Sequence, residues 1–387
     1  MKPSNTLKFV FALILTVLCI NPGFSQNQNI EKNLEEILVR NKAVGLAVVA
    51  VKDGKIIYHK SLGYKDLENS IPLADGDLFR IASISKSFTA TAIMQLVEKG
   101  KIELEGDVSD YIGFKVRNPN FPDTKITIKM LLSHSSSLND SEGYFNLNVI
   151  NPDSSKSWTK AYNNYKPGTK YEYCNLGFNT LGTILERVSG ERFDKYIVNH
   201  ILKPLKLYGG YEVGSLDSTK FVRIYSYNQD GSYKWSKEAY APRTNEIKNY
   251  KFGYSTPIFS PTGGMKISAL GLAKVMMMHM NYGTLGKKHI IGKPSAELMQ
   301  SSIIETDPED NGYYGFAIRT TEDLVDGKKM IGHTGGAYGV FTSMFWDSDR
   351  QFGFIVMTNG CNERRDHHFM SIHREVDNCL YNSLIKK

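Results

Sequence analysis

The sequence predicts an α+β fold: an antiparallel sheet built from both chain ends and flanked by terminal helices. Two observations carry this prediction. Apolar residues alternate with polar ones, as in strands, at about 40–65 and again at about 312–360. The stretch between them, about 83–300, shows mostly helical spacing broken by loops, which indicates an inserted, mainly helical region.

The composition is that of an ordinary globular chain. Of the 387 residues, 41% are hydrophobic and 22% are charged, which excludes disordered and collagen-like proteins. The length suits one large domain or two closely packed ones. The net charge of +7 is spread along the chain, so no nucleic-acid partner is expected. The 4 Cys residues are too few for a disulfide framework or a cysteine-rich zinc module.

The N-terminus has the pattern of a secretory signal peptide. Lys2 and Lys8 precede an apolar run over 9–20, and a cleavage site of small residues follows. The run has about 12 residues, whereas crossing a bilayer takes about 20. We therefore expect residues 1–25 to be removed, leaving 26–387 as an exported domain, periplasmic or secreted, with no stable membrane span.

Two questions about the cysteines stay open. The alternative to a free exported protein is a lipoprotein anchored through Cys19, although Leu18 is larger than the residue that such processing prefers. The mature chain keeps Cys174, Cys361 and Cys379, an odd number, so at most one disulfide can form. Whether Cys361 pairs with Cys379 is not decided by the sequence.

The first elements are a helix and a hairpin. Residues 30–40 have amphipathic helical spacing. Alternating segments at 44–51 and 55–63 flank an Asp-Gly pair, which is a strong β-hairpin signal. Helical spacing resumes over 82–98 and ends at Gly100.

The rest of the chain predicts helices in the middle and strands near the end. Residues 205–262, rich in Tyr and Gly, give weak signals, so we expect loops and a short hairpin there. The elements with clear periodicity are helices at 176–188, 269–280 and 366–384 and strands at 315–320, 339–346 and 352–358.

One pair of residues at a predicted helix start is suited to nucleophilic chemistry. Ser83 and Lys86 share a face of that helix and can hydrogen-bond. A serine hydroxyl is a weak nucleophile until a base removes its proton, and a lysine becomes that base when its pKa falls from about 10.4. The N–H groups of the helix start can hold an oxyanion. The same spacing at Ser157 and Lys160 lies in a polar loop, and we interpret it as a chance match.

Two further segments carry polar groups suited to such a site. Tyr173 and Asn175 follow a Pro-Gly turn and directly precede a predicted helix. The His-Thr-Gly-Gly run at 333–336 lies at the end of a short strand, and its glycines allow a ligand to approach the backbone. Taken separately, each fragment is equally typical of a packed tyrosine or a Gly-rich turn.

In this order and spacing, the three segments resemble the serine β-lactamase and penicillin-binding-protein superfamily, whose signatures include Ser-x-x-Lys and Lys-Thr-Gly. The likeness is to class C β-lactamases and to D-alanyl-D-alanine carboxypeptidases and esterases of the same branch. It covers nearly all of the mature chain and implies a β-lactamase/DD-peptidase-like fold. Four further segments share it: 79–82 (FRIA), 128–138 (IKMLLSHSSSL), 260–264 (SPTGG) and 359–360 (NG).

The resemblance implies a role for each candidate residue. Ser83 would be the acylated nucleophile, Lys86 its base or proton shuttle, and Tyr173 the acid and base for the leaving group and the deacylating water. Whether Lys86 or Tyr173 is the main base stays open. His333 would hydrogen-bond Tyr173 or a substrate carboxylate, and the backbone N–H groups of Ser83 and Gly336 would form the oxyanion hole. The implied substrate-binding set is Asn175, which faces the acyl side, with His333, Thr334, Gly335 and Gly336.

The sequence departs from the family pattern at three positions. Ser137 stands where Gly is usual, so its loop is expected to differ locally. Cys174 replaces a Ser or Ala and, as a small residue, should fit. His333 replaces the Lys of Lys-Thr-Gly, as in peptidase-like and esterase-like branches, which argues against an efficient β-lactamase.

The resemblance therefore implies a serine hydrolase that acts through an acyl-enzyme on D-amino-acyl peptides of the cell wall or on related amides and esters. One alternative is a β-lactamase proper. The other is a penicillin-recognising, wall-binding protein that is acylated without turnover. The sequence leaves the physiological substrate and the oligomeric state open.

No cofactor is implied, and no metal site is expected. His367, His368 and His373 lack the spacing of a helical metal pair, and nothing nearby completes a zinc site. No Gly-x-Ser-x-Gly occurs, which argues against an α/β-hydrolase. His134 is expected to be a buried, hydrogen-bonded structural residue.

Overall fold

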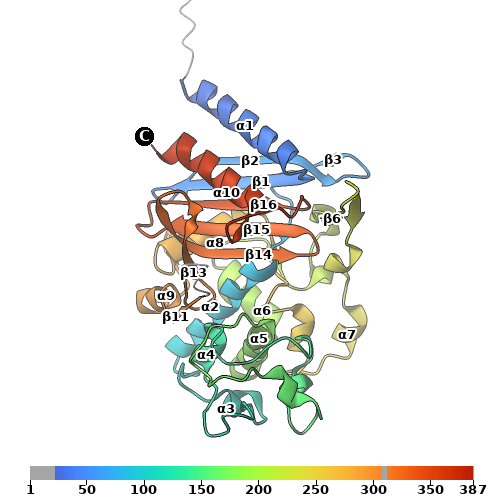
Figure 1. The fold of residues 1–387 in the computed structure, drawn as a ribbon, viewed down its shortest axis with the longest axis vertical. Helices are drawn as coiled ribbons and strands as arrows, with labels where there is room; N and C mark the ends of the chain where they lie inside the picture. Colours follow the sequence, from blue (N-terminus) through green and yellow to red (C-terminus); the bar gives the residue numbers. More distant parts are fainter. Residues whose placement is uncertain (1–21, 307–311, 387) are drawn as a thin grey trace, which may run out of the picture.

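The computed structural model describes residues 22–306 and 312–386 and has the α+β architecture that the sequence predicts. A nine-stranded antiparallel sheet separates two terminal helices on one face from the inserted, mainly helical region on the other (Figure 1). In spatial order its strands are β11 (Ile304–Glu305), β12 (Tyr313–Tyr314), β13 (Arg319–Val325), β14 (Lys328–Ala337), β15 (Val340–Asp347), β16 (Phe352–Thr358), β1 (Gly45–Lys52), β2 (Lys55–Asp66) and β3 (Ile71–Pro72).

The pairing of β1 with β16 joins the two ends of the chain. β1 and β2 form the predicted hairpin, and Val48 of β1 lies opposite Val356 of β16. Nearly every residue of β1 and β16 is buried, because helices cover both faces of the sheet at these strands. The prediction of one sheet built from both chain ends is confirmed.

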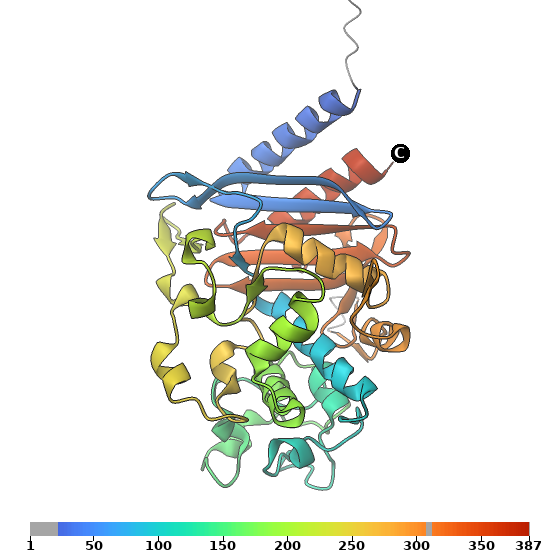
Figure 2. The ribbon, with the colours of Figure 1, turned by 180° about the vertical axis from the view of Figure 1, so that it is seen from behind.

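The helices divide between the two faces of the sheet. α1 and α10 pack together on one face, while α8 crosses the opposite face against β1, β15 and β16 (Figure 2). The helices are α1 (Pro22–Arg40), α2 (Ser85–Glu98), α3 (Val108–Ile112), α4 (Ile128–Leu132), α5 (Asn175–Ser189), α6 (Phe193–Ile197), α7 (Thr244–Lys248), α8 (Ala269–Met280), α9 (Lys293–Met299) and α10 (Ser371–Leu380).

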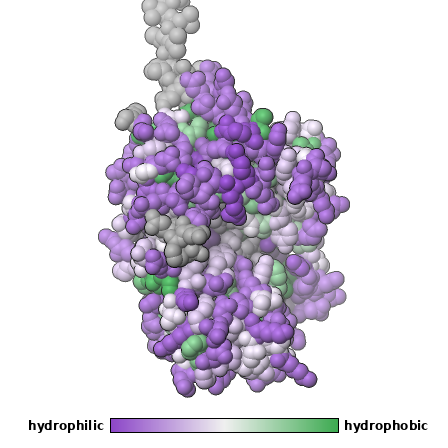
Figure 3. Space-filling model, in the orientation of Figure 1, coloured by the Kyte–Doolittle hydropathy of each residue, from purple (hydrophilic) through white to green (hydrophobic). Residues whose placement is uncertain are grey.

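The layer of terminal helices has its own apolar core. Leu34 of α1 and Val376 of α10 are fully buried against the outer face of the sheet. Glu375 of α10 accepts hydrogen bonds from Arg40 at 2.7 Å and from Asn41 at 3.0 Å. Such partly exposed ion pairs contribute little, so the apolar contacts hold this layer. The face of the molecule seen in Figure 3 is mainly hydrophilic, with apolar side chains only in small separate groups.

The inserted region is organised around α2. This helix is buried on all sides from Ser85 to Leu96, because it lies between the sheet and the other helices, and α5 packs directly against it. A small three-stranded sheet of β4 (Phe79–Arg80), β8 (Lys266–Ile267) and β5 (Gly209–Gly210) holds the segment that precedes α2. The remaining pairs are β6 (Tyr225–Tyr227) with β7 (Tyr233–Trp235), β9 (Thr284–Leu285) with β10 (Lys288–His289), and β17 (Arg365–Asp366) with β18 (Phe369–Met370).

Two sequence predictions about local structure are wrong. The strand expected at 315–320 is largely a turn between β12 and β13, in which Ala317 has φ 57° and apolar side chains face the core. The last helix begins at Ser371 rather than 366, because the residues before it form the β17–β18 hairpin. The 333–336 run lies at the end of a strand, β14, as expected. The short hairpin expected in 205–262 is present as β6 and β7.

Several expectations concern the termini and the cysteines. Most of the expected signal peptide, residues 1–21, lies outside the described residues. No helix in the described part is long and apolar enough to cross a membrane. Cys361 and Cys379 are both free thiols, as is Cys174. Ser137 keeps the left-handed backbone that favours glycine, with φ 65°, and its hydroxyl accepts a hydrogen bond from Asn118.

The packing of β14 against β15 yields a test of the fold. A methyl group at Gly332 would overlap the Met344 carbonyl oxygen of β15. We expect Gly332→Ala to lower the free energy of unfolding by about 3 kcal/mol or more, since the two strands must separate. Gly76→Ala, where the added methyl meets nothing within 4 Å, is the control and should change it by less than about 0.5 kcal/mol. Urea denaturation measures both, and equal effects would contradict this packing.

Candidate active site

Ser83 lies in a tight turn between β4 and α2. The turn is a single 3-10 turn over Ala82–Ile84, and Ala82 has a left-handed backbone with φ 45°. The Ser85 hydroxyl accepts a hydrogen bond from the Met265 N–H at 3.0 Å, which ties the start of α2 to the segment that leads into β8. The hydroxyl of Ser83 is therefore held on rigid backbone, and strained backbone of this kind is often found at functional sites.

Lys86 lies one turn further along, on the same face as Ser83. Its ammonium group donates hydrogen bonds to Ser83 Oγ at 3.1 Å, Asn175 Oδ1 at 2.8 Å and the Thr262 carbonyl oxygen at 3.1 Å. The side chain is fully buried, and all three partners are uncharged. Burial lowers the pKa of Lys86 from 10.5 to about 7, with the nearby Asp140 charge opposing the shift. A neutral amine is therefore available near pH 7 beside the Ser83 hydroxyl.

Asp140 fixes Asn175 in the orientation that Lys86 needs. One carboxylate oxygen accepts hydrogen bonds from the Asn175 backbone N–H at 3.0 Å and from its side-chain Nδ2 at 2.8 Å. The other accepts from the Leu176 N–H at 2.9 Å. Asp140 thus satisfies the first N–H groups of α5 and directs Asn175 Oδ1 toward Lys86. The Thr262 hydroxyl donates to the same Oδ1 atom at 2.7 Å.

These contacts give Asn175 a different role from the expected one. The family resemblance implied that it binds the acyl side of a substrate. In the structure both ends of its amide are held by the protein, and its carbonyl oxygen serves Lys86. Cys174 is buried beside it and donates to Asp140 at 3.4 Å. Burial raises the pKa of the Cys174 thiol well above its ordinary value, so this thiol is not a nucleophile.

Tyr173 lies on the other side of Lys86. The Lys86 nitrogen is 4.6 Å from the centre of the Tyr173 ring. Burial raises the pKa of Tyr173 above its ordinary value, although a hydrogen bond with the Ser83 side chain opposes the shift. A phenolate is therefore costly here, and Tyr173 keeps its proton while Lys86 is easily deprotonated.

His134 supports Tyr173 from behind. It is buried, and its Nδ1 accepts a hydrogen bond from the Cys174 backbone N–H at 3.1 Å. Its ring centre lies 4.3 Å from that of Tyr173. The Glu172 N–H donates to the His134 carbonyl oxygen at 2.8 Å. These contacts agree with the structural role that the sequence predicts.

His333 does not make the hydrogen bond to Tyr173 that the resemblance implies. Its Nε2 lies 2.8 Å from the Tyr314 hydroxyl, and its Nδ1 hydrogen-bonds the Thr334 carbonyl oxygen, so neither nitrogen contacts Tyr173. Burial lowers the pKa of His333 to about 3, and the Lys86 charge adds to the shift. His333 is therefore uncharged at neutral pH and cannot hold a carboxylate as a lysine would.

The remaining residues of this segment place β14 beside the nucleophile. A methyl group on Gly335 would overlap the Ile81 carbonyl oxygen and lie 3.1 Å from the Ser83 backbone nitrogen, so only glycine fits. The Thr342 hydroxyl of β15 donates to the same Ile81 oxygen at 3.0 Å. Thr334 contributes its carbonyl oxygen to His333.

These groups open onto one cavity of about 430 Å³. Of the sequence-predicted residues, Ser83, Tyr173, Asn175 and Gly336 line it. The residues predicted for the site did not include Tyr144, Phe145, Thr262 and Tyr338 on its walls, or Asp140 and Tyr314 behind them. Ser157 lies elsewhere and hydrogen-bonds Glu142 at 2.8 Å.

Two of these residues lie in or near segments that carry the family resemblance. Thr262 is part of the 260–264 segment that resembles the family, and Asp140 follows the 128–138 segment by two positions. Tyr314 lies beside a wrongly predicted strand, and no motif marks it.

Comparison with known proteins agrees with this geometry. A family model described as Beta-lactamase matches residues 29–375. Protein flp of Staphylococcus aureus (strain N315) is 32% identical over 184 residues, covering 46% of this chain and 37% of that protein. The chain thus spans well under half the length of this relative.

Two solved structures share the fold. The octameric penicillin-binding protein homologue from Pyrococcus abyssi is 25% identical with a TM-score of 0.72, covering 92% of this chain and 77% of that one. The D-amino acid amidase from Ochrobactrum anthropi SV3 is 19% identical with a TM-score of 0.73, covering 93% and 99%. Because the family model spans most of the sequence, this chain belongs to the Beta-lactamase family.

Proposed function

We propose that this protein is an exported serine hydrolase that forms an acyl-enzyme on Ser83 and acts on D-amino-acyl peptides or related amides and esters. The observation that carries the proposal is the buried, uncompensated Lys86 amine 3.1 Å from the Ser83 hydroxyl. Export rests on the signal-like pattern of residues 1–25.

In the proposed acylation step, neutral Lys86 takes the Ser83 proton as Oγ attacks the substrate carbonyl carbon. The backbone N–H groups of Ser83 and Gly336 stabilise the oxyanion. Protonated Tyr173, hydrogen-bonded to Ser83, passes a proton to the leaving amine or alkoxide as the C–N or C–O bond breaks. Lys86 then returns a proton to Tyr173. Water attacks the ester by the reverse transfers and releases the acid.

Two observations support amides or esters over β-lactams as substrates. The uncharged His333 occupies the position of the usual lysine, so a β-lactam carboxylate loses that partner. One structural relative is a D-amino acid amidase and another a penicillin-binding protein homologue. Mass spectrometry of the protein during incubation with a penicillin separates the alternatives. A Ser83 adduct that decays indicates a hydrolase, and one that persists indicates a binding protein without turnover.

The identity of the nucleophile is tested by paired serine variants. We expect Ser83→Ala to lower kcat for p-nitrophenyl esters at least about a thousandfold, because Ser83 carries the hydroxyl that Lys86 contacts. Ser157→Ala removes the other Ser-x-x-Lys serine and should leave kcat unchanged. Loss of activity in Ser157→Ala, together with retained activity in Ser83→Ala, would overturn the assignment of Ser83 as the nucleophile.

The burial of Lys86 couples stability to activity. The unfolded chain protonates this lysine below about pH 10.5, whereas the folded protein does so only below about 7. Folding therefore releases a proton between these values, and wild-type stability rises with pH there. We expect Lys86→Met to be inactive but more stable at pH 7, by on the order of 2 kcal/mol after its lost hydrogen bonds are deducted.

That stability gain should shrink between pH 7 and 10 in urea denaturation, and wild-type kcat/KM should rise through about pH 7. Lys101→Met removes an exposed lysine and is the control, with neither effect expected. A gain in stability that does not change with pH would contradict a neutral Lys86.

Asp140 is tested as a positioning residue. Asp140→Asn replaces one acceptor oxygen by a donor that faces N–H groups, so Asn175 should lose its fixed orientation. We expect kcat to fall about tenfold to a hundredfold. Removing the charge that favours protonated Lys86 should also move the pH profile to lower pH. Asp153→Asn, an exposed carboxylate, controls for net charge. An unchanged profile midpoint would mean that Asp140 acts only on stability.

A further inference from the structure

Two basic side chains lie opposite each other next to the active site. In the antiparallel pair of β4 and β8, Arg80 is the direct partner of Lys266. Like charges at directly opposed positions destabilise a sheet. Lys266 is only 3% exposed, and Arg80 is partly buried. Buried charges are normally paired with an opposite charge, yet neither side chain forms an ion pair with any described residue.

Backbone carbonyl groups accept hydrogen bonds from only some of the donor groups of Arg80 and Lys266. The Lys266 ammonium donates to the Tyr211 carbonyl oxygen at 2.6 Å. Arg80 donates from Nε to Gly263 O at 3.0 Å and from Nη1 to Ala239 O at 2.9 Å. Within the described chain no acceptor bonds Arg80 Nη2. One arm of the guanidinium group is therefore left for a ligand.

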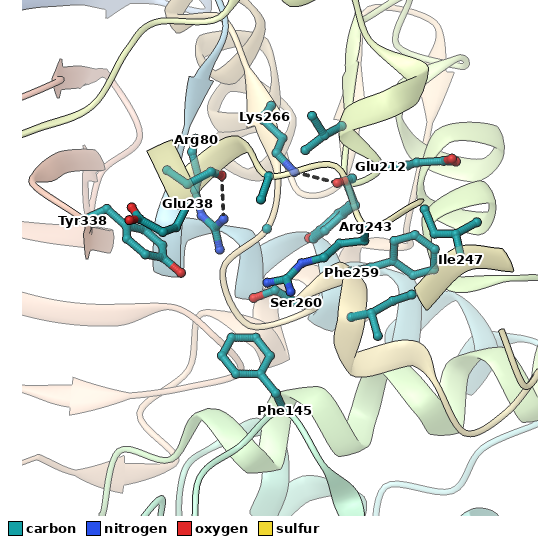
Figure 4. Close-up of a pocket in the computed structure, with 16 residues that line it drawn as sticks. Arg80, Phe145, Glu212, Glu238, Arg243, Ile247, Phe259, Ser260, Lys266 and Tyr338 are labelled. Carbon is teal, nitrogen blue, oxygen red and sulfur yellow. Dashed lines mark hydrogen bonds between the residues drawn. The ribbon is translucent and has the colours of Figure 1, made fainter. Parts of the chain in front are cut away.

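A third cation faces the same space. The guanidinium group of Arg243 extends toward that of Arg80 in the cavity that both side chains line (Figure 4). Its side chain is 47% exposed and contacts Glu246 at 3.3 Å. Burial is the main cause of the lowered pKa of Lys266 and of Arg80, and the charge of Arg243 adds to both shifts.

Apart from Glu246, which pairs with Arg243 at 3.3 Å, the nearby carboxylates do not compensate this cluster. Glu212 lines the cavity wall, but its carboxylate points away from the two guanidinium groups in Figure 4 and pairs with Arg192 at 2.7 Å. It also pairs with Lys195 at 3.2 Å. Glu238 is exposed and forms no ion pair with a described residue. The cavity therefore has an excess of positive charge.

The cavity is small and adjoins the catalytic one. Its volume is about 30 Å³, room for one small polar group and not for a whole substrate. Arg80, Phe145, Ser260 and Tyr338 line both this cavity and the one that contains Ser83. A molecule acylating Ser83 can therefore extend a side group into the positive cavity.

We propose that this cavity is a specificity subsite that binds a carboxylate of the substrate between the guanidinium groups of Arg80 and Arg243. The proposal rests on the proposed hydrolase function and names the substrate class: acyl donors with a free carboxylate on the reacting molecule. Arginine suits this group because its planar fork matches a carboxylate with two parallel hydrogen bonds. The Tyr338 ring, 5.1 Å from the Arg80 guanidinium carbon, helps to hold the fork in place.

The test compares esters that differ only in charge. Mono-p-nitrophenyl esters of succinic, glutaric and adipic acid each have a neutral partner with the same number of acyl carbons, such as p-nitrophenyl pentanoate for the glutarate. We expect wild type to prefer at least one acid ester over its partner by tenfold or more in kcat/KM. Arg243→Gln should reduce that preference about tenfold, mainly through KM, and leave the neutral ester unchanged.

Lys248→Gln makes the same charge change at an exposed residue on α7 outside the cavity and should keep the preference. Turnover of the neutral esters without any acid preference overturns the subsite and leaves the hydrolase function standing. Equal losses in Arg243→Gln and Lys248→Gln also overturn it, because the effect is then one of net charge. If no ester is hydrolysed, the proposed function fails. Calorimetric titration of wild type and Arg243→Gln with glutarate then decides the subsite: weaker binding by the variant supports it, and equal or absent binding overturns it.

Discussion

The Lys86 ammonium group is held inside the protein by three uncharged oxygen atoms, and the rest of the site is arranged around this contact. A charge at such a position loses its hydration, and no carboxylate in the described chain pairs with it. The neutral amine is therefore favoured near pH 7. The same burial that makes Lys86 a base costs folding stability, which is a common trade at catalytic sites.

The fold supplies the three oxygens from three separate segments. The turn before α2 carries Ser83, α5 presents Asn175 from its first turn, and the loop before β8 provides Thr262. β14 closes the site only because β16 pairs with β1, which brings the C-terminal strands to the nucleophile turn. Gly335 allows that approach, since any larger residue would meet the backbone before Ser83. The topology of the sheet therefore also determines the geometry of the catalytic site.

Periodicity and motif spacing predicted the parts that depend on local sequence. The β1–β2 hairpin, α8 and the helical turn that joins Ser83 to Lys86 follow from patterns within a few residues. The contacts and the charge of His333 do not follow from such local patterns. Its charge depends on burial, and its partner Tyr314 lies 19 positions away, where no motif marks it. Asp140 escaped notice for the same reason: its role depends on the fold bringing it to the first turn of α5. The strand expected at 315–320 failed because apolar residues fill the core from a turn as well as from a strand.

Direct titration of Lys86 tests this account most closely. Lysine labelled with ¹³C at Cε reports its charge by chemical shift, and the difference between wild-type and Lys86→Met spectra assigns the signal and separates it from Lys266, the other fully buried lysine with a lowered pKa. The account predicts a Lys86 midpoint close to pH 7. A Lys86 signal that stays in the charged position up to pH 10 would contradict it, and the base that activates Ser83 would then have to be sought elsewhere.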